Sequence, residues 1–357
     1  MGSLRDYPFA CSANFRRNTR IINPSLGLIN INRLSVASIS AAVAVMLAAA
    51  LVFQDRIRTR TPAGFAGVAM EKIDERSPYA ADPRWNVAKS ELRHLVSMGA
   101  TKSDVILKIN ATLRLLGDEH SMLVDPVTVK EKMSAFKGDG TPRRIEVASI
   151  DDYMYVKLPT LTEFDEAIAA KANADVSNGG AAAECGVILD LRENGGGSMW
   201  KMISAIAPLV GEGRLGYFVS GDGTRQAWGI RENRAFLGEK SMGAIPAYGK
   251  SMLSDLPVAV LIGPGTLSSG EVVASVFSTR SKARLFGQPT GGMADAREAF
   301  SLGDGSILFL TTARLAGRDG VTVPGRLRPD VWISQERSEE KDLTLVAAEE
   351  WLQSGCR

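Results

Sequence analysis

The stretch Val258-Ala-Val-Leu-Ile262-Gly-Pro-Gly265-Thr-Leu-Ser268-Ser269-Gly270-Glu271 combines three features of an α/β protein in one segment. The five apolar residues are typical of a buried strand, the glycines indicate a tight turn, and Val272, Val273 and Val276 continue as a helix. Backbone N–H groups at the start of such a helix are free to bind an anion, helped by the helix dipole. The segment therefore predicts a strand, a turn and a helix that faces a negatively charged group.

A second segment repeats this design, with the sequence Gly186-Val-Ile-Leu-Asp190-Leu-Arg192-Glu-Asn194-Gly195-Gly196-Gly197-Ser198. Short apolar runs alternate with helical patterns from about residue 144 onward. We expect strands over 153–158, 186–191, 258–262 and 283–286, helices over 163–176, 198–210, 269–279 and 342–354, and a hairpin around Gly303-Asp304-Gly305. This interleaving favours a layered α/β core with a largely parallel sheet.

Nucleotide binding is the first function that glycine-rich turns suggest, and the residues exclude it. A dinucleotide-binding fingerprint counted from Gly263 requires glycine at its sixth position, where this chain has Ser268. A phosphate-binding loop requires Gly-Lys-Ser or Gly-Lys-Thr, and neither turn contains lysine. The anion that these turns bind could instead be the oxyanion of a tetrahedral intermediate.

The hydroxyl of Ser268 has two possible roles at the start of its helix. Ser268-x-x-Glu271 fits a capping box, in which the serine only caps the helix. Alternatively, Ser268 is a nucleophile, and it then needs a base. The chain has only two histidines. His94 lies among charged residues of a predicted helix, whereas His120 follows a helix that Gly117 ends and is the available base.

The composition excludes several classes of function. The net charge is +2 and no run of five basic residues occurs, so no nucleic-acid partner is expected. Two histidines give little support for a zinc site, and we expect no metal and no other cofactor. Cys11, Cys185 and Cys356 are odd in number and far apart, so they imply no disulfide framework.

The amino-terminal region differs from the rest of the chain. Residues 34–53 carry no charged side chain over 20 positions, and a helix of that length spans a bilayer. Arginines precede it, so residues 1–33 should stay in the cytoplasm. We expect a single-pass membrane anchor with the remaining chain extracytoplasmic, which is periplasmic in a bacterium. A cleaved signal peptide with its site at Ala48-Ala49-Ala50 is the alternative.

Two further segments separate this region from the α/β core. Residues 54–63 are expected to form a polar tether, and residues 64–125 a helical subdomain. Asp82-Pro83 opens one helix with proline in the first turn, and Thr101-x-x-Asp104 resembles the capping box of another. On the helix after the first glycine-rich turn, Trp200, Leu209 and Val210 are expected to be core residues.

Taken in chain order, several blocks resemble the tail-specific or carboxy-terminal processing peptidase family. They are Leu116-Gly-Asp-Glu-His120-Ser, Tyr155-Val-Lys-Leu-Pro159-Thr, Asp190-Leu-Arg-Glu-Asn194-Gly-Gly-Gly, Leu267-Ser-Ser-Gly-Glu271 with Gly287-Gln-Pro-Thr-Gly291-Gly292, and Arg328-Pro-Asp-Val331. The resemblance covers roughly residues 64–354. It implies a core over 144–357 related to the crotonase and Clp-protease superfamily, and hydrolysis of peptide bonds. It also implies Ser268 as nucleophile and the N–H groups of Gly196 and Ser269 as the oxyanion hole.

One departure from the family pattern concerns the catalytic base. The bacterial and plastid processing branch uses a lysine in a Gly-Lys-Gly turn, and Met293 occupies that position here. A second branch, which includes the tricorn core protease and resembles interphotoreceptor retinoid-binding modules, uses histidine. His120 matches that histidine, so the resemblance implies a Ser-His mechanism with His120 as general base.

Two further departures concern the acid that orients the base and substrate recognition. Pro324 stands where the histidine branch has a glutamate, and no replacement can be chosen among Glu119, Glu271, Glu298 and Asp304. Only about 30 residues separate Ser121 from Tyr153, too few for the PDZ domain of processing peptidases. The chain is therefore expected to belong to a PDZ-less branch.

The sequence thus predicts an extracytoplasmic serine endopeptidase that hydrolyses unfolded or extended polypeptides through Ser268 and His120. Two alternatives stay open. A catalytically weak or inactive relative would bind a peptide or hydrophobic ligand, and an esterase-like hydrolase would use the same nucleophile. Polypeptide substrates, and a membrane through the amino-terminal helix, are the expected partners. The substrate and the oligomeric state are not encoded in any motif.

Overall fold

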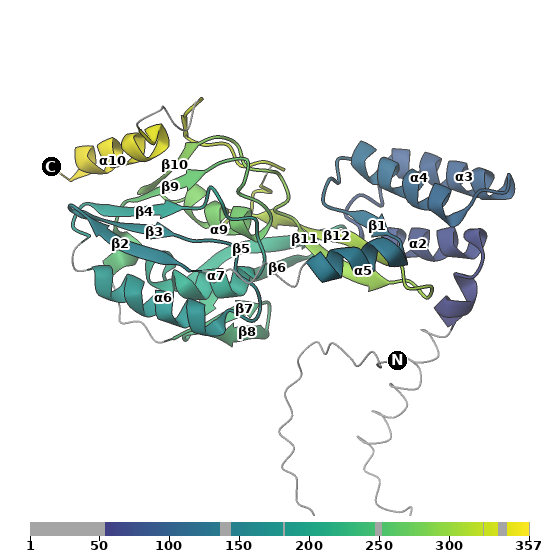
Figure 1. The fold of residues 1–357 in the computed structure, drawn as a ribbon, viewed down its shortest axis with the longest axis horizontal. Coiled ribbons are helices and arrows are strands. Elements are labelled where there is room, and N and C mark those ends of the chain that lie inside the picture. The colour runs from purple at the N-terminus through teal and green to yellow at the C-terminus, as the bar shows by residue number, and fades with distance from the viewer. Residues whose placement is uncertain are drawn as a thin grey trace, which may run out of the picture. The chain divides into compact units, whose positions relative to one another are not determined.

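The computed structural model describes residues 54–135, 144–180, 183–246, 252–323, 325–334 and 341–356, which all belong to one compact unit (Figure 1). The predicted cytoplasmic segment 1–33, the predicted membrane segment 34–53 and Pro324 lie outside the described residues. Within the described ranges, every helix is too short or too polar to cross a membrane.

A six-stranded sheet forms the centre of the α/β core, in the order β13-β10-β9-β4-β3-β2. Its strands are β2 (Glu146–Ile150), β3 (Tyr153–Lys157), β4 (Gly186–Asp190), β9 (Val258–Ile262), β10 (Ala283–Gly287) and β13 (Val331–Trp332). All neighbours pair in parallel except β2, which is an antiparallel edge strand. Every residue of β4 and β9 is buried, as expected for parallel strands that are covered on both faces. The expected parallel sheet is confirmed.

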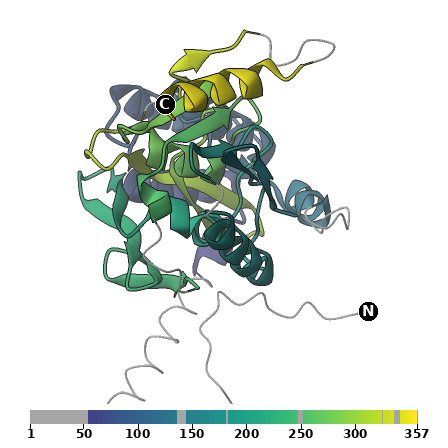
Figure 2. The ribbon, with the colours of Figure 1, turned by 90° about the vertical axis from the view of Figure 1, so that its left-hand side faces the viewer.

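Successive strand residues point to opposite faces of a sheet, so the apolar strands β4 and β9 make both faces apolar. Helices cover both faces. Val187 and Leu189 of β4 pack toward one side, with α6 (Glu166–Gly179), α7 (Met199–Ala205), α8 (Ala207–Val210) and α9 (Ser269–Ser278). Ile188 packs toward the other side, with Ala348 and Leu352 of α10 (Leu343–Gly355). Figures 1 and 2 show α10, in yellow, on the opposite side of the sheet from α6.

The single helix expected over 198–210 is two helices. Pro208 has no N–H, so it cannot donate to the carbonyl oxygen of Ser204, and the helix breaks at Ile206. The side-chain amide of Asn173 on α6 donates to this carbonyl oxygen instead, at 2.8 Å. A neighbouring helix thus satisfies the group that the proline leaves unpaired.

A second, antiparallel sheet was not expected in full. Its strands follow the order β1-β12-β5-β6-β7-β8, with β11 paired to β12. They are β1 (Met122–Val124), β5 (Gly213–Ser220), β6 (Arg225–Arg231), β7 (Arg234–Leu237), β8 (Lys240–Ala244), β11 (Ala296–Ser301) and β12 (Ile307–Ala316). Strands β11 and β12 form the expected hairpin around Gly303-Asp304-Gly305. The turn between β6 and β7 has positive φ angles at Glu232 and Asn233 but no glycine, so the usual hairpin signal is missing.

Helices dominate the region before the core. They are α2 (Pro62–Arg76), α3 (Pro83–Ser97), α4 (Lys102–Leu115) and α5 (Pro126–Ala135). Asp82 caps α3, and the predicted capping box of Thr101 and Asp104 is present on α4. Phe65, Trp85 and other apolar residues of α2 to α4 pack with residues of β12. The polar tether expected over 54–63 differs from the structure at both ends, because residues 54–58 are helical, Thr59 is fully buried and α2 begins at Pro62.

A disulfide joins Cys185 to Cys356, contrary to the expectation from cysteine spacing. Cys185 precedes β4 and Cys356 follows α10, so the bond fastens the end of this helix to the start of a central strand. The two cysteines are 171 positions apart. Only the packing of α10 across the sheet brings them together, and spacing along the sequence could not show this.

Candidate active site

Ser268 lies in a strained turn between β9 and α9. Its backbone angles, φ 51° and ψ −121°, correspond to a position of a type II′ turn that glycine normally occupies. Such a conformation costs a residue with a side chain about 1–3 kcal/mol, and it occurs where the surroundings hold it in place. In α/β-hydrolases a strained turn of this kind exposes a nucleophile. The predicted nucleophile is thus held in a conformation that a simple helix cap does not need.

Glu271 holds this turn in place. Its carboxylate is fully buried and accepts the N–H of Ser268 at 2.9 Å, the N–H of Gly292 at 2.9 Å, the N–H of Met293 and the hydroxyl of Thr290. The side chain of Glu271 therefore links the Ser268 turn to the segment after β10. Buried charge is costly unless hydrogen bonds satisfy it, and four donors do so here.

The first glycine-rich turn lies directly against Ser268. Asn194 is fully buried, and its side-chain amide donates to the carbonyl oxygens of Leu158 and Pro159 at 3.0 and 3.1 Å. Its backbone carbonyl oxygen accepts the N–H of Leu267 at 2.9 Å. A Cβ atom on Gly196 would lie 2.8 Å from that of Ser268, so only glycine fits there. Asn194 therefore joins both turns to the end of β3.

The two residues predicted as the oxyanion hole differ in their hydrogen bonding. The N–H of Ser269 has no partner among the described residues, as an oxyanion donor requires. The N–H of Gly196 donates to the side-chain oxygen of Asn194 at 3.0 Å. The N–H of Gly197 has no partner within the described part of the chain. Gly197 also accepts the Ser269 hydroxyl through its carbonyl oxygen, at 2.7 Å.

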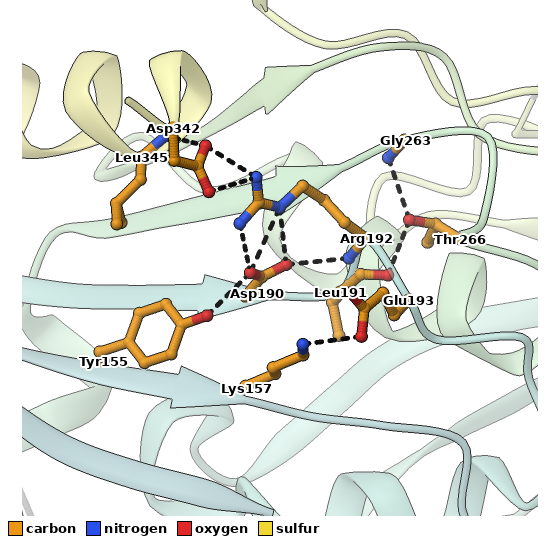
Figure 3. A network of polar contacts seen from close by, with 10 residues as sticks. All are labelled: Tyr155, Lys157, Asp190, Leu191, Arg192, Glu193, Gly263, Thr266, Asp342 and Leu345. Carbon is orange, nitrogen blue, oxygen red and sulfur yellow. Dashed lines mark hydrogen bonds and ion pairs between the residues drawn. The ribbon is translucent and has the colours of Figure 1, made fainter. Parts of the chain in front are cut away.

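A buried ionic network supports the same turn from the other side (Figure 3). Asp190 pairs with Arg192 at 2.6 Å and accepts the Tyr155 hydroxyl at 2.8 Å. Burial opposes ionisation of Asp190, but the hydrogen bonds and charge of Arg192 outweigh it and lower the pKa of Asp190. Arg192 also pairs at 2.8 Å with Asp342, which caps α10. The turn is thereby connected to the carboxy-terminal helix.

The loop that carries His120 is fixed by Asp118. This buried carboxylate accepts the N–H and the hydroxyl of Ser121 at 3.0 and 2.5 Å. It also accepts the Thr311 hydroxyl at 2.8 Å, and the Thr311 N–H donates to the Ser121 hydroxyl at 2.7 Å. The family-like block around His120 is therefore anchored to β12.

His120 is 8% exposed, and its Nδ1 lies 3.1 Å from the backbone carbonyl oxygen of Asp295. A carbonyl oxygen can only accept, so Nδ1 carries a proton and Nε2 keeps its lone pair. Burial, together with the positive charge of Arg297, lowers the pKa of His120 from its usual 6.5 to about 4. The imidazole is therefore neutral at neutral pH.

One cavity of about 980 Å³ brings these groups together. His120, Ser268, Ser269 and Gly197 all contribute to its lining. No hydrogen bond joins the side chains of His120 and Ser268 in the described part of the chain, and such contacts are often long until a substrate is bound. The lining of this cavity thus contains a hydroxyl in a strained turn, a neutral imidazole and an unpaired backbone donor.

Comparison with known proteins decides the family. The sequence profile described as Peptidase family S41 matches residues 152–333, which is half of the chain. The chain belongs to peptidase family S41. It is therefore a serine peptidase by family, and the expected resemblance to carboxy-terminal processing peptidases is confirmed.

Relatives within and around this family differ in how much of the chain they share. The nisin-resistance protein of Lactococcus lactis subsp. lactis is 24% identical over 82% of this chain and 88% of its own length. The chloroplastic C-terminal processing peptidase of Tetradesmus obliquus is 29% identical, over 51% of this chain and 35% of its own length. The solved structure of a lipoprotein from Streptococcus agalactiae shares the fold, with a TM-score of 0.61 at 21% identity, over 82% of this chain and 96% of the other.

Within the described ranges, no lysine lines the cavity that contains Ser268. Met293 uses its N–H on Glu271. Lys282, one of the two lysines after Ser268, donates to the carbonyl oxygen of Asp255. The structure thus places no lysine beside Ser268 within the ranges that it describes.

The four acids considered as partners of His120 are all engaged elsewhere. Glu271 holds the Ser268 turn, and the other three form ion pairs: Glu119 with Arg326, Glu298 with Arg76, and Asp304 with Lys102. The partner of His120 is the backbone of Asp295, which sequence reasoning missed because a main-chain carbonyl has no residue signature. Pro324, expected at the position of the orienting acid, lies outside the described residues.

Trp200 is the one predicted core residue that also lines the cavity. Leu209 and Val210 are buried as expected, but Trp200 is only half-buried. Its ring meets the buried Trp228 edge-on, with ring centroids 6.5 Å apart. An aromatic side chain therefore borders the S41 site.

Proposed function

We propose that this S41 member is a serine endopeptidase in which Ser268 attacks the substrate and His120 is the general base. The hydrogen bond between His120 Nδ1 and the Asp295 carbonyl oxygen carries the proposal. It selects the tautomer whose Nε2 can accept a proton, and it does so without a carboxylate. A neutral imidazole in the same cavity as Ser268 is the form that general base catalysis requires.

In this mechanism the Ser268 oxygen bonds to the peptide carbonyl carbon while its proton passes to Nε2 of His120. The oxyanion is stabilised by the Ser269 N–H and by the glycine-rich turn. In that turn the Gly196 N–H is engaged by Asn194, which favours the Gly197 N–H as the second donor. The imidazolium then protonates the leaving amine, and water hydrolyses the acyl-enzyme.

The test uses the full-length protein and a fluorophosphonate, which phosphonylates only activated serines and releases fluoride. We expect a mass increment on Ser268 that is lost in Ser268→Ala. His120→Ala should label about 10²–10⁴-fold more slowly, because the base contributes a factor of that order. An adduct on another serine would overturn the assignment of Ser268, and no adduct in folded protein would favour an inactive relative that binds a peptide or hydrophobic ligand.

We also propose that the catalytic unit lies outside the cytoplasm, anchored by residues 34–53. The apolar segment with arginines before it supports this location, as does the disulfide between Cys185 and Cys356, since such bonds persist in oxidising compartments. External protease should digest the catalytic unit of spheroplasts but leave a cytoplasmic marker intact. Protection of the catalytic unit would contradict this location.

Extended polypeptides are the substrates that we propose, because S41 relatives are peptidases. The name of the relative that matches over most of its length, nisin-resistance protein, makes nisin a peptide to include among the first substrates. We expect cleavage of a test protein in its unfolded form but not in its folded form, and mass spectrometry would identify the cleaved bonds.

A further inference from the structure

The cavity that contains Ser268 has a wall without charged groups. Six apolar side chains from five elements form it: Met199, Trp200, Phe218, Leu237, Met242 and Val272. We call this group the apolar wall. The charged residues that line the cavity all come from other segments, namely 74–76, Asp222 and 295–298. The six side chains all belong to one hydrophobic cluster or pack against it, so a substrate in this cavity would meet an apolar surface there.

The apolar wall begins next to the reacting groups. Val272 lies one helical turn after Ser268 on α9, and Met199 follows Gly197 by two residues at the start of α7. Both share the cavity lining with Ser268 and Gly197. A side chain that flanks the scissile bond would therefore contact the apolar wall while the bond lies at Ser268.

The shape of the apolar wall is supported from behind. Trp228 is fully buried, stacks on Phe218 with centroids 6.0 Å apart, and meets Trp200 edge-on. Leu237 of β7 and Met242 of β8 are half-buried and pack against the same core. A wall that is braced by an aromatic cluster keeps its surface without a ligand, so it is preformed for an apolar group.

We propose that the apolar wall is the specificity subsite of this peptidase and selects a large apolar side chain beside the scissile bond. This inference rests on the proposed function for its catalytic meaning, but not for binding. Burial of an apolar side chain against such a surface is favourable, whereas a charged side chain would lose water there without a partner. Discrimination of about 10-fold or more between the two kinds of side chain is expected.

Binding tests the apolar wall separately from catalysis. The probes are end-blocked pentapeptides Ala-Ala-X-Ala-Ala, with X as Phe, Leu, Asp or Lys, titrated into full-length Ser268→Ala by calorimetry. We expect the Phe and Leu peptides to bind at least about 10-fold more tightly than the Asp and Lys peptides. Equal affinities, a preference for charge, or no measurable binding of any peptide would overturn the subsite.

Two variants in the Ser268→Ala background assign the preference to the apolar wall. Trp200→Ala should reduce the ratio between Phe and Asp peptides, and Met242→Lys should reverse it by adding a positive charge. Trp332→Ala is the matched control, because that tryptophan is 60% exposed and does not line the cavity. An unchanged ratio in both wall variants would overturn the proposal even if the parent binds apolar peptides.

Labelling of the parent by a fluorophosphonate distinguishes the two claims. Absence of labelling together with selective peptide binding would reject the peptidase mechanism and keep the apolar wall as a ligand site. Labelling of Ser268 without selective peptide binding would keep the peptidase mechanism and reject the apolar wall as a specificity subsite. Each combination of outcomes therefore identifies which of the two proposals has failed.

Discussion

His120 is the residue on which the proposed chemistry depends, and its partner makes it unusual. A carbonyl oxygen orients the imidazole without adding the negative charge that a carboxylate would supply. Without that negative charge, burial and the positive charge of Arg297 outweigh the hydrogen bond and lower the pKa of His120 to about 4. Asp295 contacts His120 through its backbone, whereas its side chain accepts the N–H of Leu315 and has a pKa raised by burial.

This lowered pKa predicts an unusual pH dependence. Free His120 stays neutral until the pH approaches 4, so the acid limb of the labelling rate should lie near pH 4–5 rather than near 6.5. The unfolded chain takes up a proton on this histidine below about pH 6.5. Stability should therefore fall as pH falls from about 6.5 to about 4, since the unfolded state then binds more protons.

The measurement is the second-order rate of fluorophosphonate labelling between pH 3.5 and 8, with unfolding followed over the same range. His120→Ala should lose the part of the stability change that occurs between pH 6.5 and 4. A labelling midpoint near 6.5 would show that the imidazole is solvated rather than buried.

Glu271 is a positioning residue whose role the sequence pattern partly described. The pattern of a capping box predicted its contact with Ser268, but not its contacts with the segment after β10. Glu271→Gln keeps the shape and turns one oxygen into a donor that faces other donors. We expect a loss on the order of 2–4 kcal/mol in unfolding free energy, and slower labelling of Ser268.

Urea denaturation of Glu271→Gln measures this loss. Glu298→Gln is the control, because Glu298 is exposed and its ion pair with Arg76 lies at the surface. It should change stability by no more than about 0.5 kcal/mol. Equal effects of the two substitutions would contradict the role given to Glu271.

At the scale of elements, the glycine-rich turn after β4 shows how closely the backbone is packed around the site. Gly197 has φ 106°, and a Cβ atom there would lie 2.0 Å from the Leu161 carbonyl oxygen. Gly213 has a similar φ of 115°, with no atom near the corresponding position. Alanine at Gly213 would therefore cause backbone strain alone, whereas alanine at Gly197 would cause backbone strain and steric overlap.

Alanine substitution at these two glycines makes the comparison quantitative. Gly213→Ala should cost about 1–2 kcal/mol from strain alone. Gly197→Ala should cost at least about 3 kcal/mol, because the backbone at Leu161 must also move. Urea midpoints of both variants provide the test, and equal losses would show that the turn can relax.

Helices and strands could be predicted from the sequence where a single pattern of apolar residues and glycines was unambiguous. The buried runs of β4 and β9 are continuous and flanked by glycine, so their position and parallel pairing were predicted. Strands β5 to β8 were missed because their burial is partial and the turn between β6 and β7 lacks glycine, although Asp222-Gly223 and Gly238 mark the other two turns. Motifs singled out Ser268 and His120, which the structure places in the lining of one cavity, whereas the carbonyl oxygen of Asp295 could not be predicted, since any residue supplies one.

At the scale of the whole molecule, the disulfide between Cys185 and Cys356 closes a loop that contains most of the α/β core, from β4 to α10. A loop with 171 positions between its ends has large conformational freedom when unfolded, and closing it should stabilise the fold by on the order of 2–5 kcal/mol. The double variant Cys185→Ser with Cys356→Ser should therefore melt at a lower temperature than the parent.

The control is the parent with and without a reducing agent. Reduction should lower the melting temperature of the parent toward that of the double variant and should leave the double variant unchanged. Identical melting of all samples would show that the bond contributes nothing to stability in solution.

The strained backbone of Ser268 means that selection for reactivity has worked against selection for stability at this position. Glycine adopts φ 51° without the penalty that a side chain incurs. Ser268→Gly should therefore be inert and yet resist urea at least as well as the active enzyme, and a clearly less stable variant would contradict this. Random mutagenesis screened only for folded protein should accordingly tend to replace Ser268, the proposed nucleophile.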